Sequence, residues 1–143
     1  DPSNNFLPTT GTIYKHLTPA TTNEVNNSIR FDSGIQDNDK IDIHYDPMLA
    51  KLIVGGKDRN SAINNLNKSL TNTHFIGIKT NIAFLRQICN DKNFVMGNAS
   101  TNYLDTFKYT EHFDIERSFI LTASAYFLSY IKNTFVNKNF ADF

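Results

Sequence analysis

The sequence has 143 residues, which is enough for one ordinary domain with a short extension. Hydrophobic residues make up 40% of it, with 12 Phe and 6 Tyr, so the chain is too apolar for an intrinsically disordered segment. The 14 basic residues balance the 14 acidic ones and are scattered along the chain. Nothing in the charge therefore predicts a nucleic-acid or anionic-membrane partner.

The single cysteine, Cys89, has no second thiol in the chain with which to form a disulfide. This favours a reducing compartment and a buried core thiol, because Cys89 lies among apolar neighbours. The most apolar run, residues 119–131, is shorter than the roughly 20 residues that a membrane-spanning helix needs. The chain opens with "DPSNNFLP" and without Met, so we expect a piece of a longer protein.

Up to residue 54 the pattern predicts short strands separated by turns. Proline and small polar residues mark the loops, and apolar residues alternate in the strands. The predicted segments are a loop at 1–8, a strand at 11–19, a polar connection at 20–27, a strand at 28–35, a turn at 36–40, and a strand at 40–45 with Ile41, Ile43 and Tyr45 on one face.

Asp46-Pro47 interrupts this last pattern, and residues 48–54 continue as a second extended run. Strand interiors reject proline, and a buried lysine such as Lys51 is costly unless it is paired. The sequence therefore predicts a bent junction between two strands. We expect Asp46 to accept hydrogen bonds at the corner, and Lys51 either to pair with Asp46 or to reach water.

After Gly55-Gly56 the signals become helical, which makes the predicted fold class α+β: a mainly antiparallel sheet with flanking helices at 1–108, followed by a long helix within 109–143. The predicted elements are a helix capped by Asp58 with Ile63, Leu66 and Leu70 on one face, a short buried strand at 74–78, a helix capped by Thr80 or Asn81 and bearing Ile82, Leu85, Ile88 and Cys89, a short helix from Ser100, and a long helix at 114–133.

Several common chemistries have no signature in this sequence. The four histidines are far apart and have no Cys or acidic partner at metal-ligand spacing. There is no GxSxG, P-loop or GxGxxG motif. Composition and periodicity alone therefore indicate a soluble α+β domain that is part of an enzyme or assembly.

Five segments occur in one order at close spacing: "DPSNNFLPTTGTI", "IRFDSGI", "HYDPMLAKLIV", "DRNSAINNL" and "GIKTNIAFLRQI". Together they resemble the C-terminal part of the biotin carboxylase component of biotin-dependent carboxylases, over about residues 1–107. "HYDPM" with "DPSNNFLPTTG" looks most like the α subunits of 3-methylcrotonyl-CoA carboxylases, which act in leucine degradation. "DSGIQ" and "STNYL" are also similar to propionyl-CoA carboxylases.

The resemblance implies a C-terminal subdomain beside an ATP-grasp domain, in a ligase that uses ATP and Mg²⁺ to activate bicarbonate as carboxyphosphate and then carboxylates biotin. It also implies that the catalytic residues lie elsewhere in the longer protein. The arginine that stabilises the biotin enolate would fall upstream of Asp1, and no biotinyl lysine is present. We therefore expect this piece to be inactive alone and to bind none of these cofactors.

By the same resemblance, the corner at Asp46 lies near the biotin-facing side of the site. Asp46 and Lys51 are candidates to hold the residues of that site in place without contacting the substrate themselves. The alternative for both is a purely structural role at the corner. Thr101 matches a position that contacts the adenine ring, although relatives carry isoleucine there. Arg30 matches a dimer-interface position, and the alternative is a solvated side chain.

The last helix suits a segment that attaches the α subunit to a carboxyltransferase β subunit, and Phe119 and Phe127 would lie at that interface. The expected partners are this β subunit and a biotin carboxyl carrier domain, without nucleic acid or membrane. A non-catalytic interaction module, or the same lobe of a propionyl-CoA, acetyl-CoA, pyruvate or urea carboxylase, is the alternative. The location would be the cytoplasm in a bacterium and the mitochondrial matrix in a eukaryote.

Overall fold

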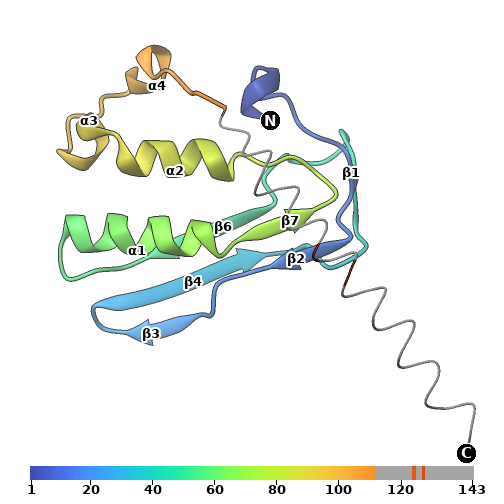
Figure 1. Ribbon diagram of the computed structural model, residues 1–143, viewed down its shortest axis with the longest axis horizontal. Coiled ribbons are helices and arrows are strands. Elements are labelled where there is room, and N and C mark those ends of the chain that lie inside the picture. Colours follow the sequence, from blue (N-terminus) through green and yellow to red (C-terminus); the bar gives the residue numbers. More distant parts are fainter. Residues whose placement is uncertain (112–123, 125–126, 128–143) are drawn as a thin grey trace, which may run out of the picture. The chain divides into compact units, whose positions relative to one another are not determined.

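The computed structural model describes residues 1–111, Ser124 and Phe127 (Figure 1). The chain divides into two units, Asp1–Tyr109 and Thr110–Phe143. The long helix predicted at 114–133 lies outside the described residues except for Ser124 and Phe127, both of which are helical. The assignment of residues 109–143 to a subunit-docking region stays a prediction.

The first unit is an α+β domain, as the sequence predicts. Its strands are short and come mostly before its helices. In chain order the elements are a 3₁₀ turn at Pro2–Asn4, β1 (Gly11–Thr12), β2 (Lys15–Leu17), β3 (Thr22–Glu24), β4 (Asn27–Ser33), β5 (Lys40–Ile41), β6 (Ala50–Val54), α1 (Arg59–Thr71), β7 (His74–Ile76), α2 (Ile82–Asn90), α3 (Lys92–Val95) and α4 (Tyr103–Thr106).

All the described strand pairs are antiparallel, which confirms the predicted sheet type. β3, β4 and β6 form a three-stranded sheet in that order, while β1 pairs with β5 and β2 pairs with β7. The register between β4 and β6 places Phe31 opposite Leu52 and Asp32 opposite Lys51. Side chains of one strand alternate between faces, so Leu52 points toward the helices while Lys51 points away.

Helix α1 connects the sheet to the rest of the core. Its N-cap is Asp58, whose carboxylate accepts a hydrogen bond from the Ser61 backbone N–H at 2.7 Å. This bond lowers the pKa of Asp58, because it stabilises the ionised form. The helix packs against β6 on one side and against α2 on another (Figure 1).

The core lies between β6, α1, α2 and α3. It contains the buried side chains of Ile63, Leu70 and Cys89, against which Leu52 and Leu66 also pack. Cys89 is therefore the buried core thiol that the sequence predicts, and burial raises its pKa. Ile63, Leu66 and Leu70 lie at helical spacing on α1, so the predicted face of this helix is confirmed.

A second group of buried side chains surrounds Phe84 on α2. Its ring meets those of Phe6, Phe107 and Tyr109 edge-on, with centroid distances of 4.9, 5.6 and 5.7 Å. Phe84 is buried, and edge-to-face contacts of this kind are favourable beyond the area that they bury. This group attaches both ends of the first unit to α2.

Two predictions about which residues form strands were wrong. Residues 20–27, predicted as a polar connection, contain β3, because β4 offers it a complete partner across a tight hairpin. The strand predicted at 40–45 ends at Ile41, because its partner β1 is only two residues long. Beyond it, Ile43 and Tyr45 are 69% and 80% exposed despite their alternating pattern.

Four further features differ from prediction. The strand predicted at 11–19 is two strands, since β1 and β2 pair with different partners. β7 is not buried as predicted: His74 and Ile76 are exposed, because its two-stranded sheet leaves a face open. The helix predicted from Ser100 begins at Tyr103, and the break after α2 contains the short helix α3, capped by Asp91.

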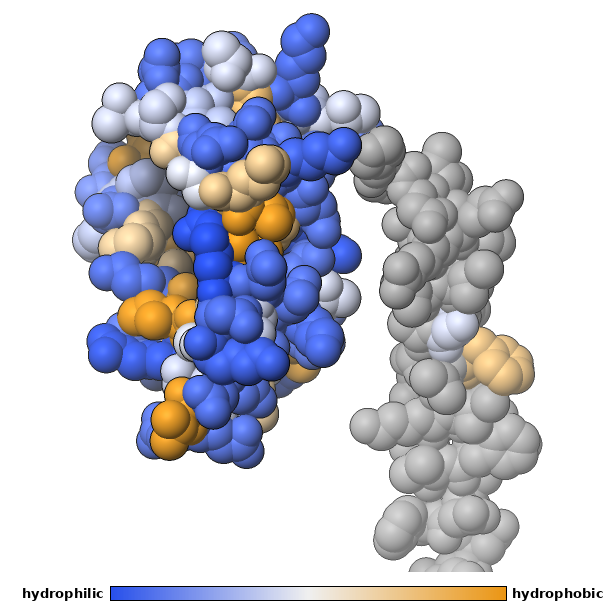
Figure 2. Space-filling model, turned by 90° about the vertical axis from the view of Figure 1, so that its left-hand side faces the viewer, coloured by the Kyte–Doolittle hydropathy of each residue, from blue (hydrophilic) through white to orange (hydrophobic). Residues whose placement is uncertain are grey.

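On the face that Figure 2 shows, most of the described surface is hydrophilic and apolar side chains form separate patches. Among the described residues, no helix is both long and apolar enough to cross a membrane.

Candidate functional site

The candidate site begins at the corner between β5 and β6, where the sequence reads "HYDPM". Residues 42–49 form an exposed loop that links strands of two different sheets, so the predicted bent junction is confirmed. The Asp46 carboxylate accepts a hydrogen bond from the Met48 backbone N–H at 2.8 Å, as expected for a corner residue. Pro47 lies outside both strands and so removes no ladder hydrogen bond.

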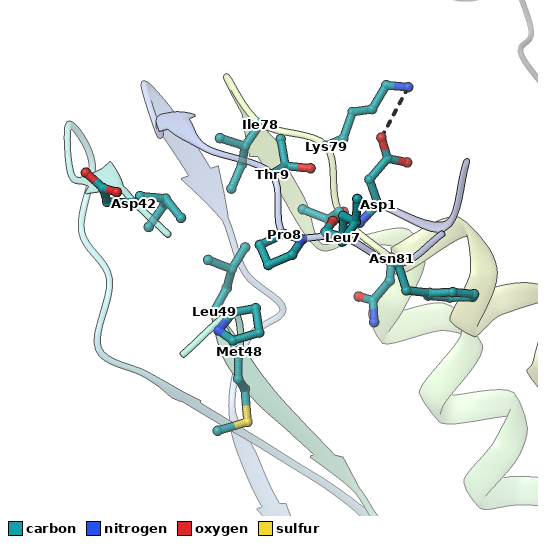
Figure 3. Close-up of a pocket in the computed structure, with 14 residues that line it drawn as sticks. Asp1, Leu7, Pro8, Thr9, Asp42, Met48, Leu49, Ile78, Lys79 and Asn81 are labelled. Atoms are coloured by element: carbon teal, nitrogen blue, oxygen red, sulfur yellow. Dashed lines mark hydrogen bonds and ion pairs between the residues drawn. The ribbon is translucent and has the colours of Figure 1, made fainter. Parts of the chain in front are cut away.

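Three segments that are distant in sequence meet at this corner and enclose a hollow of about 380 Å³ (Figure 3). One segment is the start of the chain, the second is the loop before β6, and the third is the connection from β7 to α2. The lining residues are Asp1, Phe6, Leu7, Pro8, Thr9, Ile41, Asp42, Pro47, Met48, Leu49, Ile78, Lys79, Thr80 and Asn81.

Local backbone geometry positions two of these walls. Asn5 and Phe6 have positive φ angles of 49° and 58°, which turn the chain sharply after the 3₁₀ segment. Gly77 has a φ of 116°, and a Cβ atom there would collide with the Thr12 carbonyl oxygen. Glycine is therefore required where β7 turns into the wall that carries Lys79.

The hollow combines apolar walls with a charged mouth. Leu7, Pro8 and Leu49 contribute apolar side chains, while Asp1 and Lys79 approach each other at 3.6 Å on one side (Figure 3). Such a mixture of apolar walls and a few fixed polar groups is typical of sites for small organic ligands.

Lys51 does not lie beside Asp46. It is exposed on β6, which agrees with the alternative that Lys51 reaches water. Its cross-strand neighbour is Asp32. The charge of Lys51 contributes to lowering the pKa of Asp32, although hydrogen bonding to Arg30 is the main cause. Of the two corner candidates, only Asp46 therefore belongs to the corner itself.

Arg30 is held by a carboxylate of its own strand. Its Nε donates to Asp32 Oδ1 at 2.8 Å and its Nη2 donates to Asp32 Oδ2 at 2.6 Å. This two-pronged arrangement is the preferred geometry of an arginine–carboxylate pair. Both side chains are exposed on the β4 face, and a partner that bound Arg30 would have to compete with Asp32.

Thr101 lies on an exposed turn just before α4 and is not among the residues that line the hollow. The neighbouring Tyr103 hydroxyl is buried and has no partner of good hydrogen-bond geometry. Burial raises the pKa of Tyr103 to about 12, with the nearby Asp91 carboxylate adding to the shift. The turn that carries Thr101 thus precedes a half-buried tyrosine.

The two candidates for the interface with a β subunit, Phe119 and Phe127, lie outside the first unit. Phe119 is outside the described residues. Phe127 is helical and 61% exposed, which leaves its ring available for contact.

Sequence reasoning did not find Asp1, Asp42 or Lys79 as lining residues of one hollow. Their spacing along the chain carries no signal, because three separate segments meet only after the sheets have formed. The signal that did exist was indirect: all three residues lie in or beside segments that carry the family resemblance.

Among residues 1–111, Ser124 and Phe127, no three His, Cys, Asp or Glu side chains are grouped as a metal ion would require. The described residues therefore do not fit a Mg²⁺ site.

Comparison with known proteins agrees with this geometry. Residues 1–106 match the family model of the biotin carboxylase C-terminal domain. The chain is 37% identical over 103 residues to the mitochondrial methylcrotonoyl-CoA carboxylase subunit alpha of Glycine max, covering 72% of this chain and 13% of that protein. It is 35% identical over 105 residues to the mitochondrial propionyl-CoA carboxylase alpha chain of Caenorhabditis elegans, covering 73% and 14%.

A solved structure is similar as well. The biotin carboxylase domain dimer of the Hydrogenobacter thermophilus 2-oxoglutarate carboxylase, in complex with ADP, magnesium and bicarbonate, has a TM-score of 0.69 and 31% identity, covering 78% of this chain and 24% of that chain. The chain spans only about one seventh of the curated relatives that it matches. The match covers residues 1–106, so the chain belongs to the biotin carboxylase C-terminal domain family.

Proposed function

We propose that this chain is the C-terminal lobe of the biotin carboxylase component in the α subunit of an acyl-CoA carboxylase. One observation carries the proposal. Three of the five segments on which the family resemblance rests, those that contain "DPSNNFLP", "HYDPM" and "GIKTN", contribute residues to the lining of the hollow. Apolar walls with a few polar groups, as in this hollow, are typical of ligand sites.

In the longer protein, the reaction would be the ATP-dependent carboxylation of biotin by bicarbonate. This lobe would supply one wall of the site, while the residues that bind ATP, Mg²⁺ and bicarbonate would come from preceding domains. Asp46 would support the wall by holding the corner before β6 in shape. Thr101 would contact the adenine ring, and its exposed turn leaves it accessible to a nucleotide.

An assay of phosphate release by the purified full-length protein tests for this reaction. The proposal predicts that phosphate release from ATP requires bicarbonate and increases with free biotin, because phosphate leaves when the carboxyl group passes from carboxyphosphate to biotin in a site that excludes water. The isolated 143-residue chain is the matched control and should release no phosphate above background. ATP turnover by the full-length protein that ignored both biotin and bicarbonate would contradict the proposal.

The acyl acceptor that we propose is 3-methylcrotonyl-CoA. The support is the 37% identity to the Glycine max subunit, with propionyl-CoA carboxylase at 35% as the main competitor. A panel of 3-methylcrotonyl-CoA, propionyl-CoA, acetyl-CoA, pyruvate and urea, offered to the complete assembly with labelled bicarbonate, separates these possibilities. The highest kcat/KM should be obtained with 3-methylcrotonyl-CoA.

The partners that we propose are a biotin carboxyl carrier domain and a carboxyltransferase β subunit. Both methylcrotonoyl- and propionyl-CoA carboxylase relatives carry the name of an alpha subunit or chain. A blot of the native protein with labelled streptavidin should show biotin on the same long chain, and a full-length chain without biotin would point to a stand-alone biotin carboxylase. Those eukaryotic relatives are named as mitochondrial, and the matrix is the proposed location in a eukaryote.

A non-catalytic interaction module is the second candidate, and the exposure of the Phe127 ring favours it. Phe119→Ala and Phe127→Ala in the full-length protein distinguish the two. Loss of a partner complex with unchanged ATP turnover would assign the helix to docking. Unchanged binding would remove the support for this helix as an interface.

A further inference from the structure

The Asp1 carboxylate closes a turn at the edge of the hollow. Its Oδ1 accepts hydrogen bonds from the Ser3 backbone N–H at 3.0 Å and from the Ser3 hydroxyl at 2.7 Å. The Asp1 carbonyl oxygen accepts from the Asn4 and Phe6 backbone N–H groups, both at 3.0 Å. The Asp1 nitrogen donates to the Leu7 carbonyl oxygen at 2.9 Å, so the turn from residue 1 to 7 is closed on itself.

This carboxylate is mostly shielded from water, since the Asp1 side chain is only 14% exposed. A shielded charge is costly unless an opposite charge or several donors compensate for it. Lys79 supplies that charge: its ammonium lies 3.6 Å from Asp1 Oδ2 and donates to the Ser3 hydroxyl oxygen at 3.3 Å. Lys79 belongs to the connection from β7 to α2, 78 positions further along the chain by residue number.

The contact therefore joins two of the three walls of the hollow, as Figure 3 shows. One wall is the turn at residues 1–7, which also places Phe6 against Phe84 of α2. The other is the connection at residues 78–81, whose path Gly77 fixes. The third wall, at Met48 and Leu49, is built by the loop before β6 and does not depend on Lys79.

We propose that Lys79 is a positioning residue for the substrate site of the longer protein, acting through Asp1 and Ser3. This inference rests on the proposed function. Any residue that precedes Asp1 in a longer chain continues from the point that Lys79 holds, so the ion pair fixes where such a segment meets the edge of the hollow. A shift of about 1 Å in such a segment is enough to slow a reaction about 100-fold when reacting groups must be aligned.

The effect should fall on biotin and not on the nucleotide. The Lys79 contact lies at the hollow beside the "HYDPM" corner, whereas Thr101, the proposed adenine contact, lies on a separate turn before α4. Lys79→Met keeps the length and apolar part of the side chain and removes only the charge. We expect it to lower kcat/KM for free biotin by about tenfold or more while KM for ATP changes by less than about twofold.

Three variants of the full-length protein accompany it. Lys79→Arg keeps the positive charge and should recover most of the activity, and Ser3→Ala should cause a smaller loss than Lys79→Met, because it removes one of the two groups that Lys79 contacts. Lys57→Met is the matched control, since Lys57 is exposed before α1 and outside the hollow. It should leave kcat/KM for biotin unchanged.

The outcomes separate this inference from the proposed function. A wild-type protein without biotin-dependent ATP cleavage would overturn the proposed function. A wild-type activity that Lys79→Met leaves intact would overturn the role of Lys79 alone. If Lys79→Met lowered kcat/KM for biotin and for ATP equally and also lowered the Tm, Lys79 would contribute to stability only. If Lys79→Met did not fold, a normal kcat/KM for biotin in Ser3→Ala would overturn the positioning role.

Discussion

Phe84 is the ring at which both ends of the first unit converge, and its truncation is a direct test of how that unit is held together. Its side chain is 7% exposed and meets three other rings edge-on. Phe84→Ala removes this buried ring and leaves a cavity, which in protein cores costs about 3–5 kcal/mol. Because small domains unfold with only about 5–15 kcal/mol, the substitution should remove a large fraction of the stability.

Urea denaturation of the 143-residue chain, followed by circular dichroism, measures this loss through the midpoint and the m-value. Tyr45→Ala is the matched control, because that aromatic ring is 80% exposed. The control should change the free energy of unfolding by less than about 0.5 kcal/mol. A loss below about 1 kcal/mol for Phe84→Ala at an unchanged m-value would refute the packing that we describe.

Three further predictions concern single side chains. Hydrogen bonds from Lys15 first, and then from the neighbouring backbone, lower the pKa of Asp37 from 3.8 to about 2. The stability that this carboxylate adds is present above about pH 4 and is lost as the pH falls through about 2. The free energy of unfolding should therefore fall less steeply with decreasing pH for Asp37→Asn than for wild type in that window, and equal slopes would contradict the assignment. Asp58→Ala should lower the urea midpoint by removing the cap of α1, while Asp58→Asn, which also caps well, should retain most of it; indistinguishable midpoints would refute the cap. Because Cys89 is buried and its pKa is raised, a thiol reagent should modify it far more slowly in the native chain than in urea, and equal rates would show that the thiol is accessible.

Sequence reasoning succeeded where a pattern was local. Asp58 caps α1, and the apolar residues that follow it at helical spacing face the core, because a helix satisfies its backbone within one segment. Cys89 is buried for the same reason, since its neighbours on α2 define one apolar face. The Asp46-Pro47 corner was also readable, because proline restricts the backbone regardless of tertiary context.

The failures concern strands, whose formation depends on a partner strand. The alternation through Ile43 and Tyr45 indicates a strand, yet β1 supplies too few residues to pair with them. Thr22–Glu24 carries no apolar signal, yet it forms β3 because β4 lies beside it. A strand needs a neighbour that the local pattern does not specify.

The candidate site was predictable only in part. Asp46 was placed at the corner from its own sequence context, and the structure agrees. For Lys51 the sequence left two alternatives, a pair with Asp46 or a side chain in water, and the structure shows it exposed on β6 opposite Asp32. Lys79 was not singled out, because its contact with Asp1 depends on how β7 turns toward α2.

The most direct test of the central claim is the transfer of labelled bicarbonate to free biotin by the purified full-length protein in the presence of ATP. The account predicts labelled carboxybiotin that forms only when ATP, bicarbonate and biotin are all present, and none with the 143-residue chain alone. A full-length protein that is folded and binds ATP but transfers no label to biotin would contradict the account.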